Sequence, residues 1–407
     1  MRRALAATRP VIEGIGTMQL FDQARAARAM ASHGIDVILA TTRTNVGYLA
    51  DYYAHTIARQ PFYQDDGSHY DIVAGLPRDS DQGAFLTPST GEEGELAEGI
   101  CWIEDLRYCG PKLVVEGNDS TTMVNTDPAK AAAEALADRG LDAATIGVEM
   151  DDIPVNLFQR LQHHLPKVRF VDAGPVLWEM RVVKTGEEIQ RLRQAAQVTE
   201  TAIDYAYSRV RTGSSERQFA HDVFAKLAAC GGVPQWCHAA FGPKGAHNVN
   251  PTDHRIESGQ VARTDVGGSF TQYICDMSRV AVLGRASDEL RRTHDAVLRT
   301  YEAVRRAIEP GIRGHQLHAI GKTEMSQAGR ELFLPTVGHG VGRDVHEPPF
   351  LSADCQWILE PGMVMTVEIA LRIEGLGSIN VEDEVLVTDD GHELITTMSP
   401  ALRILDD

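Results

Sequence analysis

The second half of the sequence repeats one order of predicted elements, and this repeat limits the possible folds more than any other feature. Apolar residues at helical spacing predict helices that begin near Glu187 and Glu216, and strands follow over 257–283. The same order recurs from Asp288 and ends in strands over 361–388. Two passes of helix, helix and β-hairpin predict a pseudo-symmetric α+β domain whose functional site lies on the shared axis.

The first half has a different pattern, which predicts a separate α/β domain. A helix that ends at Gly34 precedes an apolar strand, a second helix covers 128–139, and a third starts near Pro154. A chain of 407 residues is also longer than one hydrophobic core usually supports. We therefore predict an α/β domain over residues 1–178 and an α+β domain over 179–407.

Charge and hydropathy exclude several classes of partner. The formal net charge is −18 at pH 7, so DNA, RNA and anionic membrane surfaces would be repelled. Apolar runs are too short to span a bilayer, and Arg9 and Pro10 interrupt the amino-terminal segment before a signal-peptide core could form. The six cysteines lack paired spacing, which is typical of reduced thiols. These features predict a soluble cytoplasmic protein.

Acidic residues stand inside the predicted strands, where they are uncommon. In the segment RTDVGGSFTQYICDMSR, Asp265 and Asp276 are equidistant from a point between Phe270 and Thr271. Residues that face each other in a hairpin project to the same side of the sheet. A loop wider than a tight turn would therefore bring the two carboxylates together.

The second predicted hairpin behaves in the same way. Glu368 and Glu382 are equidistant from Gly375, the natural turn residue. Four carboxylates on one half-buried face would repel one another and lose hydration, a cost that protonation or bound cations remove. Solvated strand charges are the simpler interpretation for either hairpin alone, but not for both together.

A histidine in a glycine-rich segment completes a candidate metal site. The segment TVGHGVGRDVHEPPF places His339 in a predicted glycine-rich turn that lets the backbone come close to a site, and His346 follows seven residues later. A set of two aspartates, two glutamates and a histidine suits two divalent ions that share carboxylates. Manganese is the first expectation, with iron, cobalt and zinc as alternatives. Two such ions can generate hydroxide and stabilise a tetrahedral intermediate.

Residues 180–400 resemble the pita-bread family of metallopeptidases and their relatives, which includes methionine aminopeptidase, aminopeptidase P, prolidase and creatinase. The likeness rests on the segments RVVKTGEEIQRLRQAA, TDVGGSFTQYICDMSR, GHGVGRDVHEPP, LEPGMVMTVE and NVEDEVLVTDDG. It implies a creatinase-like amino-terminal domain, a pita-bread catalytic domain and a homodimer. The family's metal ligands correspond, in chain order, to Asp265, Asp276, His339, Glu368 and Glu382.

The resemblance also implies catalytic roles. His247, eighteen residues before Asp265, corresponds to a histidine that contacts substrate, and His346 corresponds to the histidine of the family's HE.P element. The implied reaction is attack on an amide carbonyl by a hydroxide that the two ions share. Glu368 would take and relay the proton, and His247 or His346 would support the oxyanion. We expect His238 and His254 to be structural.

The sequence departs from the proline-specific members of the family at two positions. Pro335 stands where they carry a histidine, and Asn380 stands where they carry an arginine. Both differences remove polar contacts that a Xaa-Pro dipeptide would use. A Xaa-Pro dipeptidase or aminopeptidase acting on a small peptide is therefore the default prediction, with proline specificity left open.

Two other readings of the sequence remain open at this stage. One is a metal-dependent enzyme of the same fold that acts on a small non-peptide compound, as a C–N hydrolase or a C–S lyase. Arg263 counts against the lyase, because that group carries an acid at this position. The other is a non-catalytic binding protein, which the complete ligand set disfavours.

Overall fold

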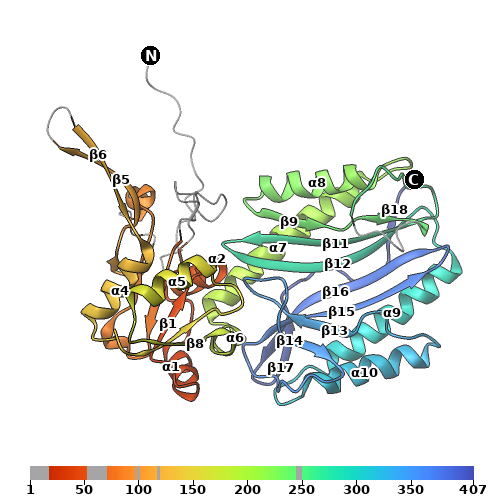
Figure 1. The fold of residues 1–407 in the computed structure, drawn as a ribbon. Coiled ribbons are helices and arrows are strands. Elements are labelled where there is room, and N and C mark those ends of the chain that lie inside the picture. The colour runs from red at the N-terminus through yellow and green to blue at the C-terminus, as the bar shows by residue number, and fades with distance from the viewer. Residues whose placement is uncertain (1–17, 53–70, 97–98, 100, 117–119, 244–249) are drawn as a thin grey trace. The chain divides into compact units, whose positions relative to one another are not determined.

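The computed structural model describes residues 18–52, 71–96, 99, 101–116, 120–243 and 250–407 (Figure 1). The chain forms two compact units, which divide between Leu177 and Trp178. Each unit has a hydrophobic core of its own. In the described ranges, every helix is too short or too polar to cross a membrane.

The amino-terminal unit is built around a six-stranded mixed sheet with the strand order β4-β3-β2-β1-β7-β8. The predicted helix end at Gly34 is confirmed, because this residue follows the first helix with a φ of 66°. The elements are α1 (Gln23–Ser32), β1 (Val37–Ala40), α2 (Arg43–Ala50), β2 (Ala74–Pro77), β3 (Phe85–Leu86), α3 (Glu93–Leu96), β4 (Asp105–Leu106), β5 (Gly110–Glu116), β6 (Ser120–Thr126), α4 (Pro128–Asp138), β7 (Thr145–Val148), α5 (Val155–His164), β8 (Arg169–Asp172) and, at the boundary, α6 (Gly174–Arg181).

The carboxy-terminal unit contains the two predicted passes of helix, helix and hairpin. The order is confirmed, and each pass has two additional short strands before its hairpin. The elements are α7 (Gly186–Arg209), α8 (Glu216–Ala229), β9 (Val233–Cys237), β10 (Ala240–Phe241), β11 (Val261–Phe270), β12 (Tyr273–Leu283), α9 (Asp288–Arg306), α10 (Gly314–Gln327), β13 (Thr336–Gly340), β14 (Glu347–Ser352), β15 (Val364–Ile373), β16 (Gly377–Thr388), β17 (Gly391–Leu394) and β18 (Arg403–Leu405).

The helices α7, α8 and α9 begin at residues whose side chains accept hydrogen bonds from free backbone N–H groups. Thr185 and Glu188 form a capping box at the start of α7, with each side chain accepting from the other residue's backbone N–H. Ser215 caps α8 and Ser287 caps α9, each by accepting from the backbone N–H three residues later. The helix starts predicted near these positions are therefore fixed by local polar residues.

The large sheet is arranged symmetrically about its centre. Its strand order is β10-β11-β12-β16-β15-β13-β14, and β9 also pairs with β11. The first hairpin therefore adjoins the second through β12 and β16 (Figure 1). The short strands β9 and β10 pair with β11, β13 pairs with β15, and β17 and β18 pair with β16 and β12. This arrangement agrees with the predicted pseudo-symmetry and places the shared axis between β12 and β16.

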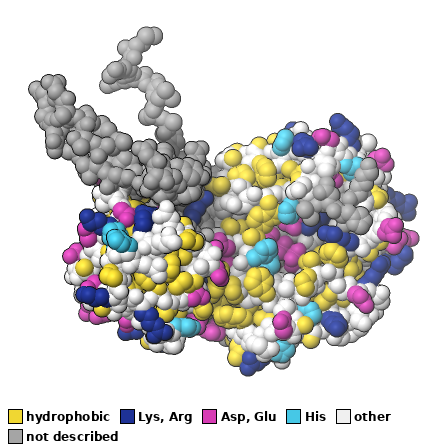
Figure 2. Space-filling view, in the orientation of Figure 1, with side chains coloured by type: hydrophobic (Ala, Val, Ile, Leu, Met, Phe, Trp, Pro, Cys, Tyr) yellow, Lys and Arg dark blue, Asp and Glu magenta, His cyan; other side chains and the backbone are white. Residues whose placement is uncertain are grey.

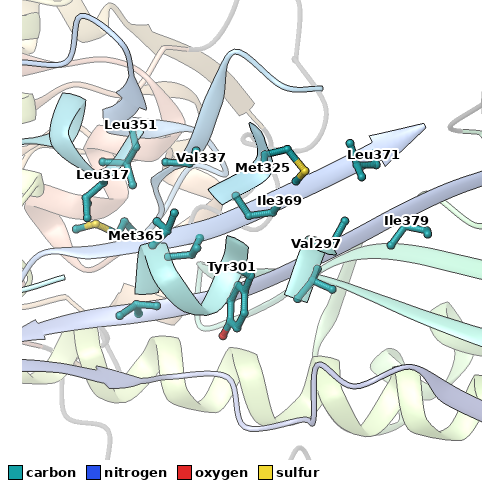
Figure 3. Packing of buried hydrophobic residues seen from close by; sticks show 14 of the residues in the cluster. Val297, Tyr301, Leu317, Met325, Val337, Leu351, Met365, Ile369, Leu371 and Ile379 are labelled. Atoms are coloured by element: carbon teal, nitrogen blue, oxygen red, sulfur yellow. The ribbon is translucent and has the colours of Figure 1, made fainter. Parts of the chain in front are cut away.

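Alternation along the second hairpin separates a core face from a polar face. Ile369 and Leu371 of β15 and Ile379 of β16 belong to a buried cluster that includes Val297 and Tyr301 of α9 (Figure 3). Successive strand residues point to opposite faces, so the intervening positions project away from these helices. Glu368 and Glu382 occupy such positions.

Candidate metal centre

Three acidic side chains lie in one row across four neighbouring strands. Asp265 of β11 pairs with Ser278 of β12, and Ser278 pairs with Glu382 of β16. Glu382 pairs in turn with Glu368 of β15. Paired residues of antiparallel strands project to the same face, so the three carboxylates share one face of the sheet. Figure 2 shows acidic and histidine side chains gathered near the middle of the visible face of the carboxy-terminal unit.

The predicted pairing of Asp265 with Asp276 is wrong. A two-residue turn joins β11 to β12, and its residues Thr271 and Gln272 both have positive φ, 47° and 69°. This turn pairs Asp276 with Gly267. The displacement is two residues, an even number, so Asp276 remains on the face of Asp265, two residues nearer the turn than Ser278, the partner of Asp265.

The predicted pairing in the second hairpin is confirmed. Glu368 and Glu382 are direct partners in the register of β15 and β16. Gly375 lies at the centre of a three-residue turn with a φ of 77°, a conformation that glycine adopts without strain. The glycine therefore fixes the register that brings the two glutamates together.

His339 lies on a strand, so the predicted glycine-rich turn is wrong at this position. The glycines on either side of His339 lie close to the backbone of neighbouring segments: a Cβ on Gly338 would lie 2.0 Å from the Thr366 carbonyl oxygen, and one on Gly340 would lie 2.2 Å from the Pro348 carbonyl oxygen. His339 Nδ1 is 3.0 Å from the Gly340 carbonyl oxygen. That contact favours the tautomer in which Nδ1 donates and Nε2 is free to bind a cation.

Buried carboxylate oxygens surround this imidazole. His339 Nε2 lies 3.7 Å from Asp276 Oδ2 and 3.7 Å from Glu382 Oε1. Within the described part of the chain, Asp276 Oδ1 and Glu382 Oε1 have no hydrogen-bond partner, although both residues are buried. Buried anionic oxygens without donors are costly, and a bound cation would remove that cost.

The ligand atoms form three overlapping groups, in each of which all atoms lie within 4.8 Å of one another. The groups are Asp265 with Asp276 and Glu382, Glu368 with His339 and Glu382, and His346 with Asp276 and His339. Glu382 and Asp276 each belong to two groups. Shared carboxylates of this kind fit a pair of neighbouring divalent ions.

Mutual repulsion and burial govern ionisation in the cluster. Burial and then the charge of Asp265 raise the pKa of Glu368 to about 7. Burial and neighbouring carboxylates raise the pKa of Asp276 and of Glu382 well above the usual range. Burial lowers the pKa of His339 to about 4, so the imidazole is neutral at pH 7, as a metal ligand requires.

The two candidate catalytic histidines differ in what the structure shows of them. His346 is exposed, and its ring centroid lies 4.5 Å from that of His339 with the ring planes at 75°. It therefore lies at the solvent side of the acidic cluster. His247 lies outside the described residues, so its role stays a prediction.

A buried cluster of charged side chains holds the chain in place at the start of β14. Glu347 accepts hydrogen bonds from Arg181, from Lys184 Nζ at 3.0 Å, and from the backbone N–H groups of Arg343 and Asp344 at 3.0 and 3.1 Å. Burial opposes ionisation of Glu347, but the charges of Arg181 and Lys184 lower its pKa to about 2. The cluster fixes the backbone on either side of His346.

Several polar residues that surround Asp265 were not predicted from the sequence. Trp236 Nε1 donates to Asp265 Oδ1 at 2.8 Å, and an Arg263 terminal nitrogen donates to Oδ2 at 2.8 Å. The ring of His238, which we expected to be structural, has Nδ1 3.7 Å from the same Oδ2. Alternation along β11 could have revealed Arg263, two residues before Asp265. The other two residues reach Asp265 from β9 and its end, a strand that the sequence pattern did not reveal.

Asn380 occupies a central place in the polar network. Its Nδ2 donates to Glu368 Oε1 at 2.9 Å and to Ser278 Oγ at 3.0 Å. Ser278 Oγ in turn donates to Glu382 Oε2 at 3.1 Å. The residue that departs from the proline-specific pattern therefore orients one glutamate directly and the other through a serine.

Family models match nearly the whole of the described chain. Residues 190–389 match the model of metallopeptidase family M24, and residues 23–183 match the creatinase/prolidase N-terminal domain. The chain belongs to metallopeptidase family M24. The predicted combination of a creatinase-like α/β domain and a pita-bread catalytic domain is thereby confirmed.

Individual relatives agree with this M24 assignment. The chain is 28% identical over 285 residues to a Xaa-Pro dipeptidase of Lactobacillus helveticus, which covers 69% of this chain and 77% of the relative. The structure resembles a Xaa-Pro dipeptidase from Bacillus anthracis with a TM-score of 0.78 at 23% identity, covering 94% of this chain and 99% of that one. It also resembles an X-Pro aminopeptidase from Thermotoga maritima, with a TM-score of 0.76, 21% identity, and coverage of 94% and 99%.

As an M24 member the protein is a metal-dependent peptidase. The alternative of a small non-peptide substrate is not favoured by these likenesses.

Proposed function

We propose that this M24 protein is a Xaa-Pro-type dipeptidase or aminopeptidase that holds two divalent ions through Asp265, Asp276, His339, Glu368 and Glu382. The observation that supports this proposal most directly is the row of paired acids across the sheet, joined by Asp276 and His339 and containing buried oxygens that lack donors. Manganese is the first candidate for both ions, because the oxygen-rich donor set suits it. The family resemblance supports a homodimer, and the sequence supports a cytoplasmic location.

The bound ions would supply a nucleophilic hydroxide at neutral pH and polarise the amide carbonyl. Glu368 is suited to accept the proton, because its pKa of about 7 allows both protonation states near neutrality. The Asn380 amide donates to Glu368 Oε1 and holds this carboxylate in place. His346, at the exposed side of the cluster, and His247 are the candidates to support the oxyanion.

Proline specificity is the finer part of the proposal. The names of the relatives favour it, whereas Pro335 and Asn380 depart from the proline-specific pattern. The test is hydrolysis of a Xaa-Pro dipeptide and the matching Xaa-Ala dipeptide by protein reconstituted with manganese. We expect the Xaa-Pro peptide to be cleaved at least about tenfold more efficiently, which corresponds to roughly 1.4 kcal/mol of transition-state discrimination.

Equal cleavage of the two dipeptides would contradict proline specificity, and the protein would then be a general M24 dipeptidase. Failure to cleave either peptide with both ions bound would contradict the peptide substrate itself. Comparing the dipeptides with tripeptides of the same first two residues separates a dipeptidase from an aminopeptidase.

Manganese should stabilise the protein more at pH 8 than at pH 6. A carboxyl whose pKa rises from 4.5 to about 7 on folding favours the folded state below pH 4.5, and this contribution, on the order of 3 kcal/mol, is lost as the pH rises through 7. The metal-free cluster is then charged and self-repelling, and cations relieve that repulsion. Thermal unfolding with chelator and with manganese at the two pH values measures the difference, and an equal or larger manganese effect at pH 6 would contradict it.

A further inference from the structure

Asp265 differs from the other carboxylates of the cluster because both of its oxygens already have a donor. Trp236 Nε1 lies 2.8 Å from Oδ1, and Arg263 lies 2.8 Å from Oδ2. Among the described residues, by contrast, Asp276 Oδ1 and Glu382 Oε1 have no hydrogen-bond donor. Asp265 is therefore stabilised as an anion before any cation binds.

Arg263 is a buried residue that lies beside the proposed metal ligands. It precedes Asp265 by two residues on β11, and residues two apart on a strand share a face. Only 8% of the residue is exposed, and its Nε has no hydrogen-bond partner among the described residues.

We propose that Arg263 competes with a cation for Asp265 and thereby weakens the metal position that uses this carboxylate, the one formed by Asp265, Asp276 and Glu382. A divalent ion there must share the Asp265 carboxylate with a fixed positive charge. This inference rests on the proposed five-ligand set and adds a role for a residue outside it.

The contrast between the two donors to Asp265 explains why charge is the decisive property. An indole N–H is neutral, and ligating carboxylates commonly accept such hydrogen bonds, which orient them without opposing the metal. A guanidinium is always charged, so it adds repulsion of the cation to its hydrogen bond. Removal of Arg263 should therefore strengthen metal binding, and removal of the Trp236 indole should weaken it or leave it unchanged.

The test is calorimetric titration of the metal-free, full-length protein with Mn²⁺ at pH 8. We expect the wild-type protein to bind two ions. In Arg263→Gln the weaker dissociation constant should fall roughly 10- to 100-fold, with the tighter one unchanged. Arg263→Met, which keeps an apolar stem, is a second uncharged variant. Arg263→Lys keeps the positive charge and should leave both dissociation constants as in the wild-type protein.

Two controls isolate the mechanism. Arg217→Gln removes an arginine from an exposed ion pair with Asp253, so it reproduces the change in net charge and should not alter either affinity. Trp236→Phe should not strengthen the weaker position. Unchanged dissociation constants in both uncharged Arg263 variants would overturn this inference alone. Absence of Mn²⁺ binding in the wild-type protein would instead overturn the proposed metal site.

Discussion

Replacing Asp276 with asparagine is expected to lower peptidase activity on the order of 1000-fold or more and, at the same time, to raise the melting temperature of the metal-free protein. Asp276 belongs to two of the three groups of ligand atoms, so its loss weakens both metal positions. Its pKa is raised well above the usual range by burial and by Asp265 and Glu368, which means that the charged form opposes folding near neutral pH. A neutral amide of the same shape removes that opposition.

The matched control for Asp276→Asn is Asp253→Asn. The Asp253 side chain is 80% exposed in its ion pair with Arg217, so this variant should change neither activity nor stability appreciably. Activity with saturating manganese and thermal unfolding with chelator provide the two measurements. A metal-free Asp276→Asn protein that is less stable than the wild type would show that the acidic cluster is not a source of repulsion.

Replacing Glu347 with glutamine is expected to destabilise the carboxy-terminal unit by about 3–5 kcal/mol, because two buried cations would lose their shared carboxylate. The side chains of Arg181, Lys184 and Glu347 are 3%, 1% and 1% exposed, so water cannot replace the missing charge. Since the wild-type Glu347 pKa is about 2, its contribution is present above pH 4.5 and is lost only as the pH falls through about 2. The destabilisation should therefore persist across the range from pH 5 to pH 8.

The comparison variant is Glu393→Gln. Glu393 pairs with Arg193, but both side chains are well exposed, at 49% and 39%, so a loss below about 1 kcal/mol is expected. Urea unfolding midpoints of the two variants measure the difference. Similar midpoints for both would mean that the cluster around Glu347 gives the fold no more stability than a surface pair.

The sequence predicted the face on which the acids lie better than it predicted their partners. Alternation along each strand assigns a face regardless of register, and for that reason Asp276 is on the predicted face although its predicted partner was wrong. Register depends on the turn, and Thr271 and Gln272 adopt positive φ without the glycine or asparagine that usually signals such a turn. In the second hairpin Gly375 gave that signal, and the pairing was correct.

Other features of the site depend on contacts between segments that are distant in the sequence. β13 has the composition of a turn, and it is a strand because its glycines allow close contact with neighbouring backbones. Trp236 contacts Asp265 only because β9 pairs with β11. The apolar pattern of the five-residue segment that forms β9 did not predict this pairing. Such contacts are set by tertiary packing, and propensity and periodicity do not encode them.

The symmetric sheet has a further consequence. The first hairpin contributes Asp265 and Asp276, the second contributes Glu368 and Glu382, and the strands of the two hairpins pair through Ser278 and Glu382. Two of the three groups of ligand atoms draw on both passes of the repeat, so a cation bound at either of these groups would link the two halves of the domain. Binding of a cation at these groups would then require that both halves have folded and packed together. The enzyme would be active only when the whole domain is assembled.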